Sequence, residues 1–216
     1  MENLERYAHH FDIAFPEYAE IRYAEICRML SHYDTIGILD IVRGPQFADF
    51  VELIKPLTAI KNYKSQVPFP ENLQEVTSCI VGIRTTPVSN SDRFRSHTDF
   101  FKQLVSIQGF QLPTTSAVFH FCHPHHFPIV DVNVKAACGL LKERYPRDFA
   151  DIEAPLLPAP NTSALNKLSK YRGFLVFIDR VRSLQQAYGG NPNYRYTDKA
   201  LMVLGVPELR TKVENQ

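Results

Sequence analysis

The residues best suited to chemistry lie between Ser106 and Leu141, where a carboxylate follows a short segment rich in histidine and proline. Asp131 comes directly before a run with helical periodicity, so its side chain is expected at the N-terminus of a helix. Upstream, Gly109 is typical of a turn between two helices, and Pro113 would open the second of them. Such a turn presents backbone N–H groups that can hold a phosphate oxygen. The sequence therefore predicts a phosphate-binding turn with an acidic group close to it.

A longer pattern surrounds the acid, since residues Pro128 to Lys135 read Pro-Ile-Val-Asp-Val-Asn-Val-Lys. This segment resembles the catalytic segment of the helix-hairpin-helix DNA glycosylase superfamily, the group of endonuclease III and the adenine-mismatch glycosylases. The family's hairpin then falls on Ile107 to Thr115 without a gap. The resemblance implies an all-α protein with two helical lobes and a cleft between them, which binds double-stranded DNA as a monomer. It places the catalytic acid at Asp131.

The same resemblance implies which residues contact DNA. They belong to the hairpin turn and to the first turn of the helix behind the acid: Gly109, Phe110, Gln111, Thr114, Asn133 and Lys135. A solvated side chain is the alternative interpretation of Lys135.

In the family, the acid supports cleavage of an N-glycosidic bond, which leaves positive charge on the sugar. A carboxylate at Asp131 would stabilise that charge or orient a water molecule toward C1′. The target base must first leave the stack, which favours damaged, mismatched or modified bases. The alternative interpretation of Asp131 is an ordinary helix N-cap, a role that is common for aspartate.

Three departures from the family pattern affect the expected reaction. Gln111 replaces the second hairpin glycine, and Pro113 stands where bifunctional members carry their Schiff-base lysine. The chain has only four scattered cysteines, at Cys27, Cys79, Cys122 and Cys138, so we expect no iron–sulfur cluster and no other cofactor. We therefore expect a monofunctional glycosylase that leaves an abasic site. A non-catalytic DNA-binding or interaction module on the same fold is the alternative.

A histidine cluster precedes the acid and allows more than one interpretation. It comprises His120, His123, His125 and His126, together with Cys122. These side chains could contact phosphate or the flipped base, or they could be polar residues of an exposed turn. Imidazole and thiolate also suit zinc, so a metal-dependent hydrolase is a third hypothesis, although no recognised ligand spacing completes a site. We favour the exposed turn over a metal site.

A basic stretch lies ahead of the hairpin and contains Arg84, Arg93, Arg95 and His97. If the family's arrangement applies, these side chains lie on the face toward DNA. The alternative is that they are merely solvated.

Apolar periodicity and turn residues predict the helices that must position these groups. We expect helices beginning at Pro16, over residues 47–54 and 71–80, and after a cap at Ser91 or Asp92. Further helices are expected over residues 132–144, from Leu165 to a stop at residues 189–190, and over residues 197–204. Two short apolar runs, residues 35–42 and 117–121, could instead be strands. Residues 154–161 hold three prolines and are expected to cross the surface as an ordered loop.

Composition and charge set the broad class. The 216 residues suit a single compact helical unit, with residues 1–55 plus 150–216 forming one lobe and residues 56–149, which include the hairpin and the acid, forming the other. Residues 1–54 carry four arginines against ten carboxylates, whereas residues 55–216 carry twenty basic residues against thirteen carboxylates. This asymmetry fits a protein with one face toward phosphates, although solvated surfaces explain it equally well. No apolar run is long enough for a membrane span, and the acidic N-terminus lacks the order of a signal peptide, so we expect a cytoplasmic protein.

Overall fold

The protein is all-α throughout the part that its computed structural model describes, which comprises residues 4–16, 24, 73–89, 92–107 and 110–216. Eight helices and no strand occur in this part. They are α1 (Glu5–Ala14), α6 (Leu73–Thr85), α7 (Thr98–Ser106), α8 (Leu112–Cys122), α9 (Val132–Arg144), α10 (Ala164–Ala187), α11 (Tyr194–Gly205) and α12 (Pro207–Glu214). The predicted all-α class is thus confirmed for the described residues.

Side-chain caps and one glycine set several helix boundaries. Ser163 caps α10 by accepting a hydrogen bond from the Asn166 N–H, and Asn193 caps α11 by accepting one from the Arg195 N–H. At the other end of α10, Gly189 has a φ of 77°. The N–H of Gly190 then reaches back to the Gln185 carbonyl oxygen at 2.8 Å, which closes the last turn. The helices predicted over residues 132–144 and from Leu165 to the glycine pair are therefore confirmed.

One local prediction was wrong, and one open alternative is excluded. Asp92 does not cap α7, because its carboxylate accepts the N–H of Phe94 in a separate turn, and the helix begins only at Thr98. Residues 117–121 are helical rather than extended, since they lie inside α8. This helix is buried on nearly all sides, and an all-round buried helix has no polar face to reveal its periodicity. The helix expected to begin at Pro16 and the expectations for residues 35–42 and 47–54 fall largely or wholly outside the described residues.

The last helix, α12, has no counterpart among the predicted elements. In the sequence, Gly205, Val206 and Pro207 indicate only the end of the helix expected over residues 197–204. Pro207 instead opens α12, where its missing N–H removes no helical hydrogen bond. The Pro-rich crossing over residues 154–161 is free of helix and strand, as expected.

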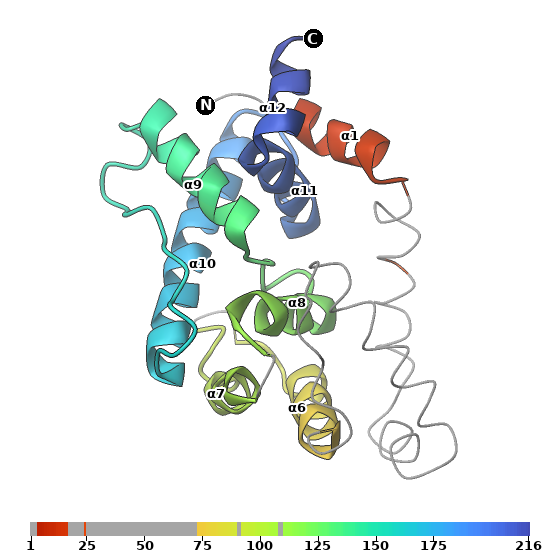
Figure 1. The fold of residues 1–216 in the computed structure, drawn as a ribbon, viewed down its shortest axis with the longest axis vertical. Helices are drawn as coiled ribbons and strands as arrows, with labels where there is room; N and C mark the ends of the chain where they lie inside the picture. Colours follow the sequence, from red (N-terminus) through yellow and green to blue (C-terminus); the bar gives the residue numbers. More distant parts are fainter. Residues whose placement is uncertain (1–3, 17–23, 25–72, 90–91, 108–109) are drawn as a thin grey trace.

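The helices form one core, with α10 running beside two groups of helices (Figure 1). On one side α11 packs against α1, α9 and α12, and on the other α7 packs against α6, α8 and α10. Aromatic rings from α7, α8, α10 and the flanking loops pack around Phe94, those of Phe101 and Tyr171 edge to face and those of Phe119 and Phe127 tilted. The division into lobes 1–55 plus 150–216 and 56–149 includes residues outside the described part and stays a prediction.

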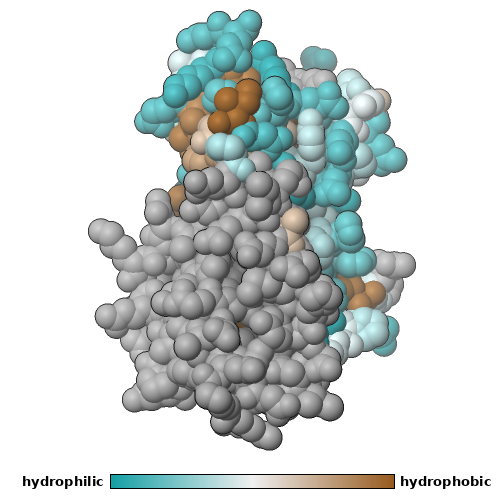
Figure 2. All heavy atoms as spheres, turned by 90° about the vertical axis from the view of Figure 1, so that its right-hand side faces the viewer, coloured by the Kyte–Doolittle hydropathy of each residue, from teal (hydrophilic) through white to brown (hydrophobic). Residues whose placement is uncertain are grey.

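The described surface is mostly polar. Figure 2 shows hydrophilic side chains over most of the described residues on the face where α1 lies. Ile13 on α1 is one of the exposed large apolar side chains among the described residues, and the same face carries a small apolar patch (Figure 2). No helix among the described residues has the length and hydropathy needed to cross a bilayer.

Candidate functional site

Helix α8 holds the loop that leads to Asp131. Ser116 and His120 are four residues apart, so both point from one face of the helix. The Ser116 hydroxyl oxygen accepts the N–H of Val130 at 3.0 Å, and its own proton goes to the Pro113 carbonyl at 2.8 Å. The His120 Nδ1 lies 2.7 Å from the carbonyl oxygen of Phe127. The loop therefore runs back along α8, antiparallel to the helix.

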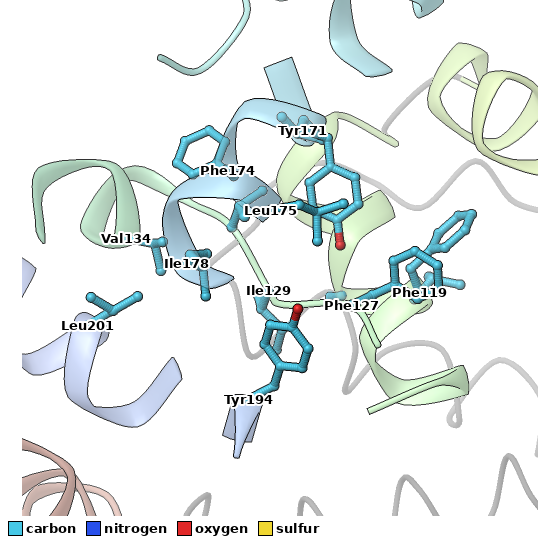
Figure 3. Close-up of a cluster of buried hydrophobic side chains, with 14 of the residues drawn as sticks. Phe119, Phe127, Ile129, Val134, Tyr171, Phe174, Leu175, Ile178, Tyr194 and Leu201 are labelled. Carbon is cyan, nitrogen blue, oxygen red and sulfur yellow. The ribbon is translucent and has the colours of Figure 1, made fainter. Parts of the chain in front are cut away.

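A second support comes from α10. The Tyr171 hydroxyl donates a hydrogen bond of 2.7 Å to the Pro128 carbonyl, and this side chain is fully buried. Figure 3 shows Tyr171 from α10 and Tyr194 from α11 on either side of the loop that carries Phe127 and Ile129. Because buried hydrogen bonds are costly to break, this loop is held in one conformation up to the residue before the acid.

Asp131 is a half-buried N-cap of α9 with extended backbone angles. One carboxylate oxygen, Oδ1, accepts the N–H groups of Asn133 at 3.0 Å and Val134 at 2.9 Å. These bonds fix the orientation of the carboxylate and satisfy two of the first N–H groups of the helix. The predicted cap is thus present. A cap held in this way is also a preorganised carboxylate, so the two interpretations of Asp131 are compatible.

The acid lies near the beginning of α8. Val130 is bonded to Ser116, which is four residues beyond Leu112 and therefore roughly 6 Å along the helix axis from it. The first N–H groups of an α-helix have no intrahelical partners, and Gln111 provides no side-chain cap for them. A negative charge at this end would also be favoured by the helix dipole. The residue before Asp131 is therefore held about one helical turn from the N-terminus of α8, where an anion could accept hydrogen bonds from the free N–H groups.

The structure places the predicted DNA-contact residues of the hairpin unequally. Gly109 lies outside the described residues. Phe110 is buried, and its N–H donates to the Ile107 carbonyl at 3.0 Å, so this residue serves packing and the turn. Thr114 is also buried, and its hydroxyl has no hydrogen-bond partner among the described residues. Gln111 is half-buried at the helix N-cap. Of these, Gln111 is the side chain best placed for a ligand outside the protein.

The two predicted contacts behind the acid differ in exposure. Lys135 is exposed on α9, whereas Asn133 is half-buried. The carbonyl of Asn133 packs directly against Gly205 at the end of α11, so closely that a Cβ on this glycine would overlap it. Only a glycine allows this approach of two helix backbones. The first turn of α9, and with it Asp131, is therefore fixed against α11.

The histidine cluster is split between structural and exposed positions. His120 is fully buried, and the His123 Nε2 lies 2.6 Å from the Ile83 carbonyl oxygen, which His97 also approaches at 3.2 Å. His125 is exposed and His126 is half-buried. Among the described residues, no group of three or more His, Cys, Asp or Glu side chains is arranged to hold a metal ion. This arrangement gives the metal-hydrolase hypothesis no support.

A polar network that the sequence did not reveal joins four segments. Arg93 donates to Asp179 on α10, to the Tyr194 hydroxyl on α11, and to the His126 carbonyl at 3.0 Å. Tyr194 donates to the same carboxylate, and Arg182 contacts it at 3.1 Å. Burial, followed by the charge of Asp179, raises the pKa of Tyr194 to about 12, so its hydroxyl stays protonated. These residues are up to 101 positions apart, and no local motif announces them.

The basic stretch ahead of the hairpin is therefore not uniformly available to DNA. His97 is fully buried and Arg93 belongs to this network, while Arg95 is exposed.

Comparison of the chain with protein-family models, with curated proteins and with solved structures finds no significant match.

Proposed function

We propose that the protein is a monofunctional DNA glycosylase of the helix-hairpin-helix type, in which Asp131 is the catalytic acid. The observation that carries this proposal is the hydrogen bond from Val130 to Ser116. It sets the residue before the acid about one turn from the N-terminus of α8, where a DNA phosphate would bind. This hydrogen bond keeps the carboxylate at a constant position relative to the proposed phosphate contact. A hydrolase that acts on a single nucleotide needs such fixed positions to orient its substrate.

The reaction follows from the position of the carboxylate. A flipped nucleotide brings its C1′ close to Asp131, and the C1′–N bond breaks with its electron pair leaving on the base. The carboxylate stabilises the resulting positive charge on the sugar and orients a water molecule. The water oxygen bonds to C1′, and its proton passes to the departing base. The products are a free base and an abasic site.

The absence of an amine at the start of α8 supports a reaction without strand cleavage. Pro113 occupies the first turn of this helix, where bifunctional relatives in the resembled family carry lysine. Proline cannot form the Schiff base that β-elimination requires. In this proposal the backbone of the Gly109–Gln111 turn grips a phosphate, and Asn133 and Lys135 add supporting contacts. We expect a monomer that binds double-stranded DNA between two lobes, in the cytoplasm.

A non-catalytic DNA-binding module is the second candidate, and one observation favours it. Both carboxylate bonds seen at Oδ1 of Asp131 are those of an ordinary N-cap, and a cap needs no reaction to explain it. This candidate predicts DNA binding that is unaffected by the loss of the negative charge, and it predicts no base release.

Base release from a panel of DNAs separates the two candidates. The panel contains normal, mismatched, damaged and modified duplexes, and the parent is compared with the Asp131→Asn variant. The amide oxygen of asparagine still accepts the two cap hydrogen bonds, so the fold is retained while the charge is lost. Asp99→Asn is the matched control, because this side chain is almost fully exposed on α7. Abasic sites with the parent and the control, but not with the variant, support the glycosylase.

A further inference from the structure

Positive charge converges on His126 at the C-terminal end of α8. Its carbonyl accepts a hydrogen bond from Arg93, and its ring lies 6.4 Å from the ring of His123. His125 is its exposed neighbour in the chain, and Arg182 reaches the same region from α10 through Tyr194, whose ring lies 3.6 Å beneath the guanidinium carbon. Two guanidinium groups and three imidazoles are thus gathered in one place.

The carboxylate in this cluster is already engaged. Asp179 binds Arg93, Arg182 and the Tyr194 hydroxyl, so one negative charge is shared between two cations and a neutral donor. The side chains of Arg93, Asp179 and Arg182 keep about a quarter to a third of their surface exposed, at 26%, 32% and 25%. The cluster therefore retains an excess of positive charge that solvent and solutes can reach.

The effect of this excess is visible at His126. Burial lowers its pKa, and the charges of His123, Arg93, His125 and Arg182 lower it further. Like charges held together are unfavourable unless an anion offsets them. No hydrogen bond to the imidazole of His125 or His126 is present within the described part of the chain. Ring N–H donors and an unbalanced positive field are what a phosphate group requires.

We propose that His125 and His126, backed by Arg93 and Arg182, bind a phosphate group, and that the DNA backbone supplies it. The site lies at the opposite end of α8 from the hairpin turn, about 16 Å along this helix of eleven residues. Asp131 follows His126 by five residues, so the chain between them spans at most roughly 18 Å. A DNA strand carries a phosphate about every 3.4 Å of helix axis, so a duplex at the acid has phosphates within this reach.

This second contact does not depend on catalysis by Asp131. It rests on the proposed function only in that the same DNA duplex is bound. Two phosphate contacts, one at each end of α8, would orient that duplex along the helix. This second phosphate contact gives a role to His125 and His126, whose rings neither hold the loop before Asp131 nor pack in the core.

Duplex binding measured over a series of salt concentrations tests the proposal. The His125→Gln/His126→Gln double variant is compared with the parent by fluorescence anisotropy on a labelled duplex. His9→Gln/His10→Gln is the matched control, since this pair lies on α1 and is likewise exposed and half-buried. We expect several-fold weaker binding by the first variant on every duplex, and a salt dependence shallower by about one phosphate contact. The control should bind as the parent does.

Inorganic phosphate serves as the second probe, with chloride at equal ionic strength as its reference. Phosphate is expected to shift the NMR signals of the His125 and His126 rings in the parent. If these signals shift but duplex affinity is the same in both histidine variants, the DNA source is wrong and free phosphate is the ligand. If neither probe distinguishes the parent from the variant, the site is refuted. Base release is measured separately, so loss of the glycosylase proposal would not be mistaken for loss of this site.

Discussion

Gly205 allows the sharpest test of how the acid is positioned. It ends α11 against the first turn of α9, and an added Cβ would overlap the backbone of Asn133, two residues beyond Asp131. Backbone cannot move aside as a flexible side chain can, so Gly205→Ala must separate the two helices. We expect the variant to be less stable and to carry Asp131 out of line with α8.

The magnitude follows from a comparison with Gly139 on α9, where an added Cβ meets nothing within 4 Å. Gly139→Ala should stabilise the helix by about 0.5–1 kcal/mol, because alanine loses less backbone entropy. Overpacking at Gly205 should cost about 1–3 kcal/mol. For a chain of this size, each kcal/mol shifts Tm by roughly 2–4 °C. The expected changes are thus a rise of about 1–4 °C for Gly139→Ala and a fall of about 2–12 °C for Gly205→Ala.

Urea unfolding followed by circular dichroism, together with thermal melts, measures both changes. Base release or duplex binding by the folded variant at low temperature then reports the position of the acid. If Gly205→Ala were as stable as Gly139→Ala, α9 and α11 would not approach as closely as described. Contact with α11 would then not be what holds Asp131 in place.

Three further predictions concern buried groups. Ser116→Ala removes the acceptor of the buried Val130 N–H, so it should destabilise the fold by about 1–3 kcal/mol and reduce base release more than duplex affinity. Burial lowers the pKa of His97, so the folded state binds fewer protons than the unfolded state below about pH 6.5. The free energy of unfolding should consequently fall as the pH drops through 6.5, and the slope should flatten in His97→Gln. Burial raises the pKa of Cys79 to about 12 and that of Cys138 further, so neither thiol should react with iodoacetamide at pH 8 until urea unfolds the protein.

Each of these has a control or a contrary result. Ser106→Ala removes an exposed hydroxyl that bonds only to its own helix, and its effect should stay within about 0.5 kcal/mol. An unchanged slope in His97→Gln would assign the pH dependence to other groups, of which His126 is the first, since its pKa is also lowered. Mass-spectrometric detection of rapid alkylation at Cys138 in the native protein would contradict its burial.

What the sequence could predict was set by local interactions. Asp131 caps α9 by accepting the N–H groups two and three residues further along the chain. Gly189 ends α10 through its own positive φ and the hydrogen bonds of the last helical turn. Such features lie within a few residues, so their positions follow from residue types and spacing. The N-cap of α9 and the end of α10 were therefore predicted at the correct residues.

What the sequence missed depends on distant partners or on burial. Arg93 meets Asp179 and Tyr194 at separations of 86 and 101 residues, so the basic stretch gave no sign of an internal network. The strand alternative over residues 117–121 arose because α8 is buried on nearly all sides, so no exposed polar face marks its helical period. His120 resembled a ligand in the sequence, yet its ring holds a loop carbonyl. In each case the deciding contact joins segments that no local pattern connects.

The catalytic role of Asp131 is tested by the single-turnover rate of base release on the duplex that responds in the panel, measured for the parent and for Asp131→Asn. We predict that this variant folds, binds the duplex as the parent does, and releases the base at least about 100-fold more slowly. Equal rates would show that the carboxylate is only a cap of α9. Base release by neither protein on any duplex, with equal binding by both, would contradict the glycosylase and leave a DNA-binding module.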